Sequence, residues 1–228
     1  MTPLVIIPAR GGSKGIPRKN IREMCGHPLI HYSIEAARAI APDSRIILST
    51  DDPEIAGVAR THSGLEVPYM RPASLGADNV GSREVMLDVM DWADREGIGY
   101  DCVVLLQPTS PLRTREDVER TLAAYTPGCD MAVTVRPASC NPYYDCFETT
   151  PEGYLHVSKG DGLITRRQDA PPAWQMNGAV YVINPASLRA MPLGAFAHRI
   201  PVEMEASRSV DLDTPLDWTI AETLMRNG

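Results

Sequence analysis

The sequence predicts an α/β fold in which a mostly parallel sheet carries helices on both faces. Five apolar runs have the length of buried strands, at residues 3–8, 45–49, 102–106, 131–135 and 178–183. Segments with the 3.6-residue period of an amphipathic helix lie between most of these runs. Such alternation is typical of a parallel sheet covered on both sides, where ligands bind beyond the carboxyl ends of the strands.

Three segments show the helical period, and each places its apolar residues on one face. The first spans 28–41, with Leu29, Ile30, Ile34, Ala37 and Ile40 on that face. The second spans 82–96, and Ser82 is expected to cap its first turn. The third spans 115–125 and follows a similar cap at Thr114.

Residues 137–176 interrupt this alternation with prolines and glycines, and their strand-like pieces, 143–147 and 154–157, are short. A structureless connection of about 40 residues is uncommon in a compact domain, so a small β-rich arm is expected. The chain therefore divides into one α/β domain, residues 1–136 and 177–228, and an excursion of residues 137–176.

The composition is that of an ordinary globular protein, since 43% of the 228 residues are hydrophobic and 22% are charged. Residues 1–38 contain six Lys or Arg against two Glu, although the whole chain has a net charge of −7. An acidic body with one basic corner argues against nucleic acid and favours a small anionic ligand. No run is long enough for a membrane span, and the amino terminus has no signal pattern. With five scattered cysteines, we expect a cytoplasmic protein with no membrane partner.

The first apolar strand leads into a glycine-rich loop, residues 9–20, with the sequence Ala-Arg-Gly-Gly-Ser-Lys-Gly-Ile-Pro-Arg-Lys-Asn. Glycines let backbone amides approach a ligand, and consecutive amides form a concavity for phosphate oxygens. Four cations, Arg10, Lys14, Arg18 and Lys19, add charge there. The spacing is neither that of a P-loop nor that of a dinucleotide-binding fold. The loop therefore predicts a triphosphate site of another kind.

This loop resembles the nucleotide loop of sugar nucleotidyltransferases. Its Ser-Lys-Gly-Ile-Pro-x-Lys-Asn part is similar to the acylneuraminate cytidylyltransferases, or CMP-sialic acid synthetases. The resemblance covers residues 6–218, with five motifs in the family's order, and implies a Rossmann-like fold and CTP as the nucleotide. The residues that it implies for the triphosphate are Arg10, Gly11, Gly12, Lys14 and Lys19, and Asn20 is expected to place the nucleoside.

Two further segments resemble family motifs. Residues 71–78 are similar to the segment near the cytidine half of the nucleotide, so Arg71 and Ser82 are expected to bind there. Residues 105–113 follow a buried strand and resemble the sugar-side motif. Their neutral donors and acceptors, Gln107, Thr109 and Ser110, suit a polyhydroxylated ligand. Taken without the resemblance, these hydroxyls could equally satisfy the backbone of a rigid turn.

Asp211 and Asp213 are the metal candidates. If residues 210–213 are extended, both carboxylates point to the same face. Mg²⁺ commonly takes one or two carboxylates together with substrate phosphates. Thr214 and Pro215 also form a helix-start signal, which needs neither aspartate, so both interpretations can hold. The pair matches the family's Asp-x-Asp, which implies Mg²⁺ as the cofactor.

Arg166, Arg167 and Gln168 resemble a family segment on the sugar side. An acidic sugar needs a cation for its carboxylate, and a guanidinium can hold one through two hydrogen bonds. Many relatives have an arginine where this chain has Gln175, so the identity of the acid sugar stays open. The five histidines show no metal-binding spacing and receive no role.

The sequence thus indicates a cytidylyltransferase that joins CMP from CTP to a nine-carbon 2-keto acid sugar of the N-acylneuraminate type. Arg10, Lys19 and Asp211 are the expected catalytic residues, since phosphoryl transfer depends chiefly on positioning and on neutralising charge. One alternative is transfer of CMP or GMP to legionaminic, pseudaminic or another 2-keto-3-deoxy acid. Another is a nucleotide-binding regulatory module without turnover. The resemblance also implies a homodimer whose 137–176 arm is exchanged and contributes to the partner's active site.

Overall fold

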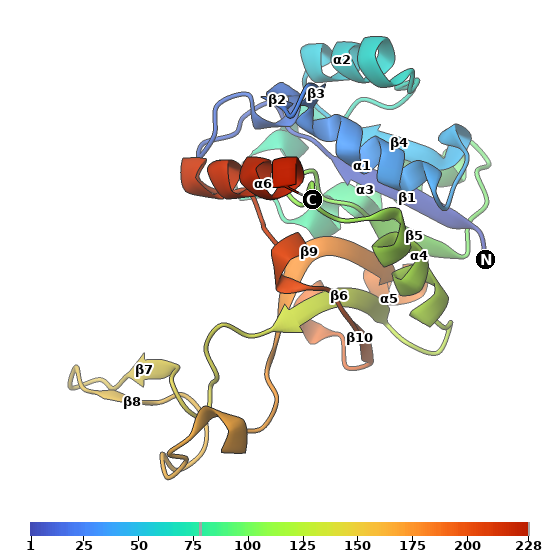
Figure 1. Cartoon of the computed structure of the whole chain (residues 1–228). Helices are drawn as coiled ribbons and strands as arrows, with labels where there is room; N and C mark the ends of the chain where they lie inside the picture. Colours follow the sequence, from blue (N-terminus) through green and yellow to red (C-terminus); the bar gives the residue numbers. More distant parts are fainter. Residues whose placement is uncertain (78, 228) are drawn as a thin grey trace.

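The computed structural model describes residues 1–77 and 79–227, and a six-stranded sheet forms its centre (Figure 1). In spatial order the strands are β10 (Arg199–Glu203), β6 (Met131–Pro137), β9 (Trp174–Ile183), β5 (Cys102–Leu105), β1 (Pro3–Pro8) and β4 (Ile46–Ser49). β1 is parallel to β4 and β5, and β10 is parallel to β6. Only β9 in this sheet is antiparallel to its neighbours. The predicted mostly parallel sheet is confirmed.

Helices cover both faces of the sheet, as the alternating pattern predicts. One face carries α1 (Leu29–Arg38), α2 (Pro53–Ser63) and α4 (Arg115–Ala124), and the other carries α3 (Ser82–Arg95) and α5 (Pro185–Ala190). Successive residues of β1 point to opposite cores, because Val5 belongs to the first and Ile6 to the second. α6 (Pro215–Asn227) packs separately, with Trp218 in a cluster that includes Ile16 of the glycine-rich loop.

Thr114 caps α4 as predicted. Its hydroxyl accepts from the Asp117 N–H, and the Asp117 carboxylate accepts from the Thr114 N–H, which makes a capping box. Thr214 and Asp217 form the same arrangement before α6. The cap predicted at Ser82 is wrong, because Ser82 is the first residue of α3 and the preceding glycine occupies the capping position.

The sequence pattern does not predict several elements. α2 buries mainly one large and two small apolar residues, Ile55, Ala56 and Ala59, so its period is weak. β10 contains Pro201 and has no fully buried residue, as befits an edge strand. The hairpin of β2 (Glu23–Met24) and β3 (His27–Pro28) is too short to form a pattern. The 3-10 helices are η1 (Lys19–Ile21), η2 (Asp43–Arg45), η3 (Ala73–Gly76), η4 (Arg167–Asp169), η5 (Leu193–Ala195) and η6 (Ala206–Arg208).

The 137–176 arm leaves the sheet at the end of β6 and returns through β9, and it projects from the body of the molecule (Figure 1). It contains one hairpin, β7 (Phe147–Thr149) with β8 (Leu155–Val157). The expected strand at 143–147 is instead mostly a turn, because the Tyr144 N–H bonds the Asn141 carbonyl oxygen.

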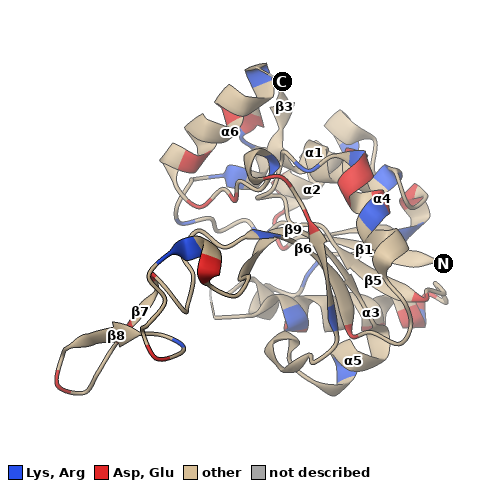
Figure 2. Ribbon diagram, turned by 60° about the horizontal axis from the view of Figure 1, so that its bottom comes forward, with Lys and Arg blue, Asp and Glu red and all other residues tan. Residues whose placement is uncertain are grey.

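A second orientation shows the β7–β8 hairpin far from the sheet, and basic and acidic residues side by side on α4 (Figure 2). None of the described helices has the length and apolar character needed to cross a membrane.

Candidate active site

A cavity of about 260 Å³ opens where β1 and β5 end. Three loops surround it: the glycine-rich loop, the loop that carries Arg71, and the loop after β5. The predicted residues that line it are Arg10, Lys19, Asn20, Arg71, Ser82, Gln107 and Thr109. The cavity thus lies beyond the carboxyl ends of parallel strands, where the fold class predicts a ligand.

The glycine-rich loop is braced by its neighbours. The Gly11 N–H donates to the Asp51 carboxylate over 3.0 Å, and Asn20 Nδ2 donates to the Arg10 carbonyl oxygen over 2.9 Å. A Cβ on Gly11 would lie only 2.7 Å from Asp52 Oδ2, so only glycine fits without movement. Asn20 is buried, and its hydrogen bond holds the loop in shape while its side chain reaches the cavity wall.

Some predicted residues occupy less direct positions. Gly11, Gly12 and Lys14 belong to the loop but are not among the residues that line the cavity, and Lys14 is exposed. Ser110 is fully buried, and its hydroxyl lies 3.5 Å from the Asn177 carbonyl oxygen. The hydroxyl of Ser110 therefore faces the protein interior.

Arg71 lines the cavity although its residue is only 6% exposed. Its Nε donates to the Ser49 hydroxyl over 3.0 Å, and a terminal nitrogen donates to the Ser49 carbonyl oxygen over 2.6 Å. Burial lowers the pKa of Arg71, and the Asp51 carboxylate acts in the opposite direction. The guanidinium is thus held in one orientation. Asp78, which completes this motif, lies outside the described residues.

Lys19 links the cavity to the two predicted metal ligands. Its Nζ donates to the Leu212 carbonyl oxygen over 2.5 Å. Desolvation lowers the pKa of Lys19, while Asp213 and Asp211 oppose that shift. Desolvation also raises the pKa of Asp211, and a hydrogen bond from the Thr109 hydroxyl offsets part of this effect. One lysine and two carboxylates therefore form a single electrostatic cluster.

The two aspartates come together through a turn. Residues 210–213 form no regular strand, and the Asp213 N–H donates back to the Asp211 carbonyl oxygen over 3.2 Å. Leu212, between them, is fully buried in the cluster that contains Ile16. Burial of Leu212 thus leaves both carboxylates at the surface. Gly15 packs so closely here that a Cβ would collide with the Asp213 carbonyl oxygen.

Gly178 brings two loops close together. Its φ is +77°, and a Cβ there would lie 2.9 Å from Gln107 Oε1 and 3.4 Å from Asp211 Oδ2. The register between β6 and β9 shifts nearby, between Val133 and Val135. The loop after β5 and the aspartate turn before α6 therefore meet over β9.

Residues 4–150 match the family model described as "Cytidylyltransferase". The chain belongs to the cytidylyltransferase family. It is accordingly a nucleotidyltransferase, and the resemblance that the glycine-rich loop indicates is confirmed.

Curated relatives extend this family match over nearly the whole chain. The "CMP-N,N'-diacetyllegionaminic acid synthase" of Legionella pneumophila is 31% identical over 99% of this chain and 97% of its own length. The "Pseudaminic acid cytidylyltransferase" of Campylobacter jejuni is 32% identical over 79% of this chain and 78% of its own. The "N-acylneuraminate cytidylyltransferase" of Streptococcus agalactiae is 30% identical over 96% of this chain and 52% of its own.

A solved structure supports the fold. CMP:2-keto-3-deoxy-manno-octonic acid synthetase complexed with CTP aligns with a TM-score of 0.71, over 100% of this chain and 99% of that chain. The sequence identity is 18%, so the comparison establishes a shared α/β architecture.

A second cavity of the cytidylyltransferase, of about 370 Å³, is lined by Asp211 and by the pair Arg136 and Gln175. These two residues face each other across β6 and β9, and Arg136 donates to Gln175 Oε1 over 3.1 Å. The guanidinium of Arg136 therefore lies beside position 175, where many relatives have an arginine. The sequence alone does not indicate Arg136, because its place depends on the register between two strands about 40 residues apart.

The cytidylyltransferase holds Arg166, Arg167 and Gln168 in the arm, where Arg166 precedes η4 and the other two belong to it. Arg166 pairs with Asp169 at 2.7 Å, and Arg167 pairs with Asp145. These three of the six predicted sugar ligands are exposed, and neither cavity described above includes them in its lining. A single chain does not bring them to the site.

Proposed function

We propose that this cytidylyltransferase transfers CMP from CTP to a nonulosonic acid, a nine-carbon 2-keto acid sugar, and releases pyrophosphate. The main observation that supports the proposal is the cluster of charged groups between the two cavities. Lys19 lines the first cavity, Asp211 lines the second, and the two charges interact. The first cavity would take the nucleotide and the second the acid sugar, so that the groups that react would meet at this cluster.

Legionaminic or pseudaminic acid is the favoured sugar within this class. The sequence alone favours the N-acylneuraminate type, but relatives named for the other two acids match this chain over most of their own length. The N-acylneuraminate relative matches over about half of its length. Gln175, where arginine is common in the sialic acid family, agrees with a different acid.

In the proposed reaction a sugar hydroxyl attacks the α-phosphorus of CTP, and the bond to the pyrophosphate oxygen breaks. Arg10 and Lys19 would offset the negative charge on the phosphates. Arg71 and Ser82 would orient the nucleoside. Gln107 and Thr109 line the first cavity but lie beside Asp211 of the second, so they would contact the sugar where it meets the nucleotide.

Arg136 is proposed to bind the carboxylate of the acid sugar. It lines the second cavity, and its side chain is already oriented by the hydrogen bond to Gln175. A guanidinium suits a carboxylate because it can donate two parallel hydrogen bonds. This assignment gives the acid a cation from within the same chain.

Asp211 and Asp213 are proposed to hold Mg²⁺. The donor set fits a hard cation, because both side chains offer carboxylate oxygens. Both residues are accessible to solvent, although the protein partly desolvates the Asp211 carboxylate. Desolvation raises the pKa of Asp211, so a cation there would relieve an unfavourable charge. When bound, the ion would neutralise charge on the phosphates of the substrate.

A homodimer with exchanged arms is proposed as the active form. Large apolar side chains of the arm are exposed in the single chain, namely Phe147, Tyr154, Leu155, Leu163, Trp174 and Met176. So many exposed apolar side chains on one arm favour a covering surface, and a second copy of the chain would supply one. The exchange would also bring Arg167 toward a site that it does not reach in its own chain.

The test is a matrix of pyrophosphate release, with CTP, UTP, ATP and GTP each combined with legionaminic, pseudaminic and N-acetylneuraminic acids. We expect release with CTP and one of the first two acids. Equal turnover with GTP would overturn the nucleotide assignment. A clear preference for N-acetylneuraminic acid would restore the sialic acid alternative.

A further inference from the structure

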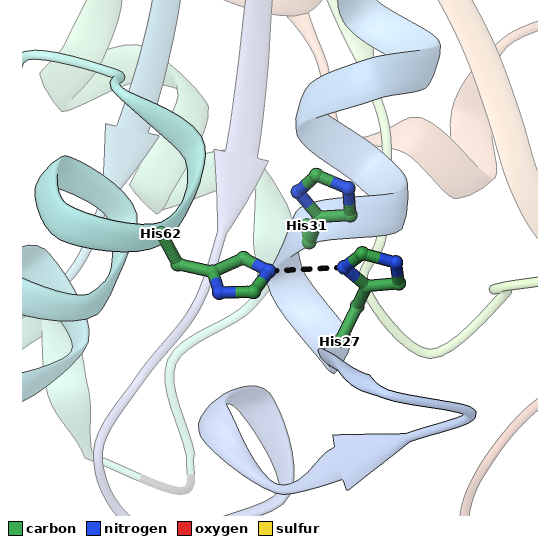
Figure 3. Close-up of side chains that lie close together, drawn as sticks. All are labelled: His27, His31 and His62. Carbon is green, nitrogen blue, oxygen red and sulfur yellow. Dashed lines mark hydrogen bonds between the residues drawn. The ribbon is translucent and has the colours of Figure 1, made fainter.

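Three histidines that are scattered in the sequence converge on one surface of the molecule (Figure 3). His27 lies in β3, His31 in the first turn of α1 and His62 in the last turn of α2. One nitrogen from each ring lies within 4.8 Å of the other two. His27 Nδ1 and His62 Nε2 are 3.0 Å apart, and the rings of His27 and His31 stack with their centroids 4.5 Å apart.

Local backbone chemistry places each of these rings. The β2–β3 hairpin turns through Cys25 and Gly26, both with positive φ, as in the type I′ turn that favours two-residue hairpins. His27 follows immediately. α2 ends at Gly64, whose φ of +65° stops the helix just after His62.

We propose that His27, His31 and His62 form a binding site for a divalent transition-metal ion of the zinc type. Neutral imidazole nitrogens are ligands that Zn²⁺ prefers, and three of them leave a fourth position for water. Tetrahedral Zn–N bonds of about 2.0–2.1 Å place ligand nitrogens roughly 3.3 Å apart. The His27–His62 separation is close to that value. The His31 ring, which stacks on that of His27, would turn out of the stack to bring its nitrogen to the metal.

The surroundings of His31 support a ligand role. Its Nδ1 lies 3.0 Å from the hydroxyl of Ser63, which leaves Nε2 for a metal. Ligating histidines usually engage their second nitrogen in such a hydrogen bond, which fixes the ring.

This site is chemically distinct from the proposed Mg²⁺ site. It offers nitrogen donors, whereas Asp211 and Asp213 offer oxygen donors. It also has a structural consequence for the catalytic loop. The hairpin that carries His27 directly follows η1, which carries Lys19, and Arg18 already bonds Asp52 at the start of α2 over 2.9 Å. A metal at the other end of α2 would fasten the same two segments a second time.

The experiment measures zinc binding to the full chain, stripped with a chelator and then kept in excess Mg²⁺ to occupy oxygen sites. Competition with a chromogenic chelator gives affinity and stoichiometry. We expect one ion per chain, and a loss of about 100-fold or more for His27→Ala and for His62→Ala, because losing even an outer partner of a ligating histidine costs about 10- to 100-fold. His156→Ala, an exposed histidine in β8, is the matched control and should bind like the parent.

Two further readouts separate a real site from a folding defect. Co²⁺ should give visible absorption in the parent and in His156→Ala, and none in His62→Ala. His27 and His62 are exposed, so their variants should keep the parent's metal-free melting temperature. Zinc should raise this temperature in the parent and the control only. Absence of zinc binding, or equal binding by all variants, overturns the proposal.

Discussion

Two features of position 178 favour glycine over every other residue type. Its φ of +77° belongs to the left-handed region, and a Cβ would press on Gln107 and approach Asp211. Gly153 shares the first feature, with a φ of +89°, but a Cβ there would meet nothing within 4 Å. Comparing alanine variants of the two glycines therefore distinguishes the effect of backbone strain from that of displacing Gln107 and Asp211.

We expect Gly178→Ala to lower kcat/KM about 100-fold, because small displacements of catalytic groups can cost that much. Gly153→Ala should leave kcat/KM unchanged. Both variants should lose about 1–2 kcal/mol of stability, since alanine resists positive φ. Steady-state kinetics and denaturant unfolding of the pair check this. Equal activity in both variants would mean that Gly178 matters only for the fold.

Asp211→Asn should lower turnover by about 100-fold or more, the loss typical of removing an electrostatic stabiliser of the transition state. The variant should not melt below the parent when both lack divalent metal. Because the pKa of Asp211 is raised, the folded protein disfavours its charged form, and the neutral amide removes that cost.

EDTA should abolish activity in the parent, and Mg²⁺ alone should restore it. Full turnover with EDTA present, or in the Asn variant, would reject a metal role for Asp211.

The sequence predicts those site residues that lie close together in the chain, and it does not predict those that come together only in the fold. Arg10, Lys19 and Asn20 share one loop, so the sequence alone places them together, and all three line the first cavity. Arg136 and the histidines depend on segments that meet only in three dimensions. His27 and His62, for example, are 35 residues apart, and the β2–β3 hairpin and α2 that hold them show no strong pattern.

Arg113 connects the loop after β5, strand β9 and helix α1 through hydrogen bonds. It donates to the carbonyl oxygens of Gln107 in the loop after β5 and of Ala179 in β9, over 3.1 and 2.6 Å, and it bonds the Ser33 hydroxyl in α1. Complete burial lowers its pKa to about 9, which still leaves it charged at neutral pH. The Gln107 loop thus depends on one buried guanidinium.

Arg113→Lys should lower the free energy of unfolding by about 2–4 kcal/mol, because an ammonium cannot reach all three acceptors and leaves buried carbonyls unpaired. Arg115→Lys is the matched control. Arg115 is exposed and pairs with Glu119, so its replacement should change stability by less than about 0.5 kcal/mol. Urea unfolding measures both, and equal midpoints would deny Arg113 this connecting role.

The elements that the sequence predicts are those with strong periods or caps. α1, α3 and α4 carry large apolar residues at helical spacing, and the cap at Thr114 follows from its Asp117 partner. The apolar pattern does not predict α2, because small residues fill much of its buried face. Asp52, Pro53 and Gly64 nevertheless mark its ends. The apolar pattern does not predict β10, because this exposed edge strand contains a proline and has no fully buried residue.

At the scale of the whole molecule, the proposal predicts a dimer whose arms complete each other's sites. We expect Asp211→Asn and Arg167→Ala to be inactive alone and to complement each other after re-pairing. In a mixed dimer one site would combine an intact Asp211 with an intact Arg167. An equal mixture should therefore recover roughly a quarter of the parent activity, since half of the dimers would hold one good site.

Light scattering checks the assembly itself. A monomer at working concentration would defeat the dimer proposal. A dimer without complementation would keep the assembly but contradict the exchange of arms.

The bond formed in the product distinguishes the proposed reaction from transfer to a sugar phosphate. Transfer of CMP to a sugar hydroxyl gives a monophosphate diester, whereas transfer to a sugar phosphate gives a diphosphate. Phosphorus NMR of the reaction with CTP and legionaminic or pseudaminic acid should show one diester signal from the product, with no phosphorus–phosphorus coupling, beside free pyrophosphate. A product with two coupled phosphorus signals, formed only from a phosphorylated acceptor, would contradict the proposed function.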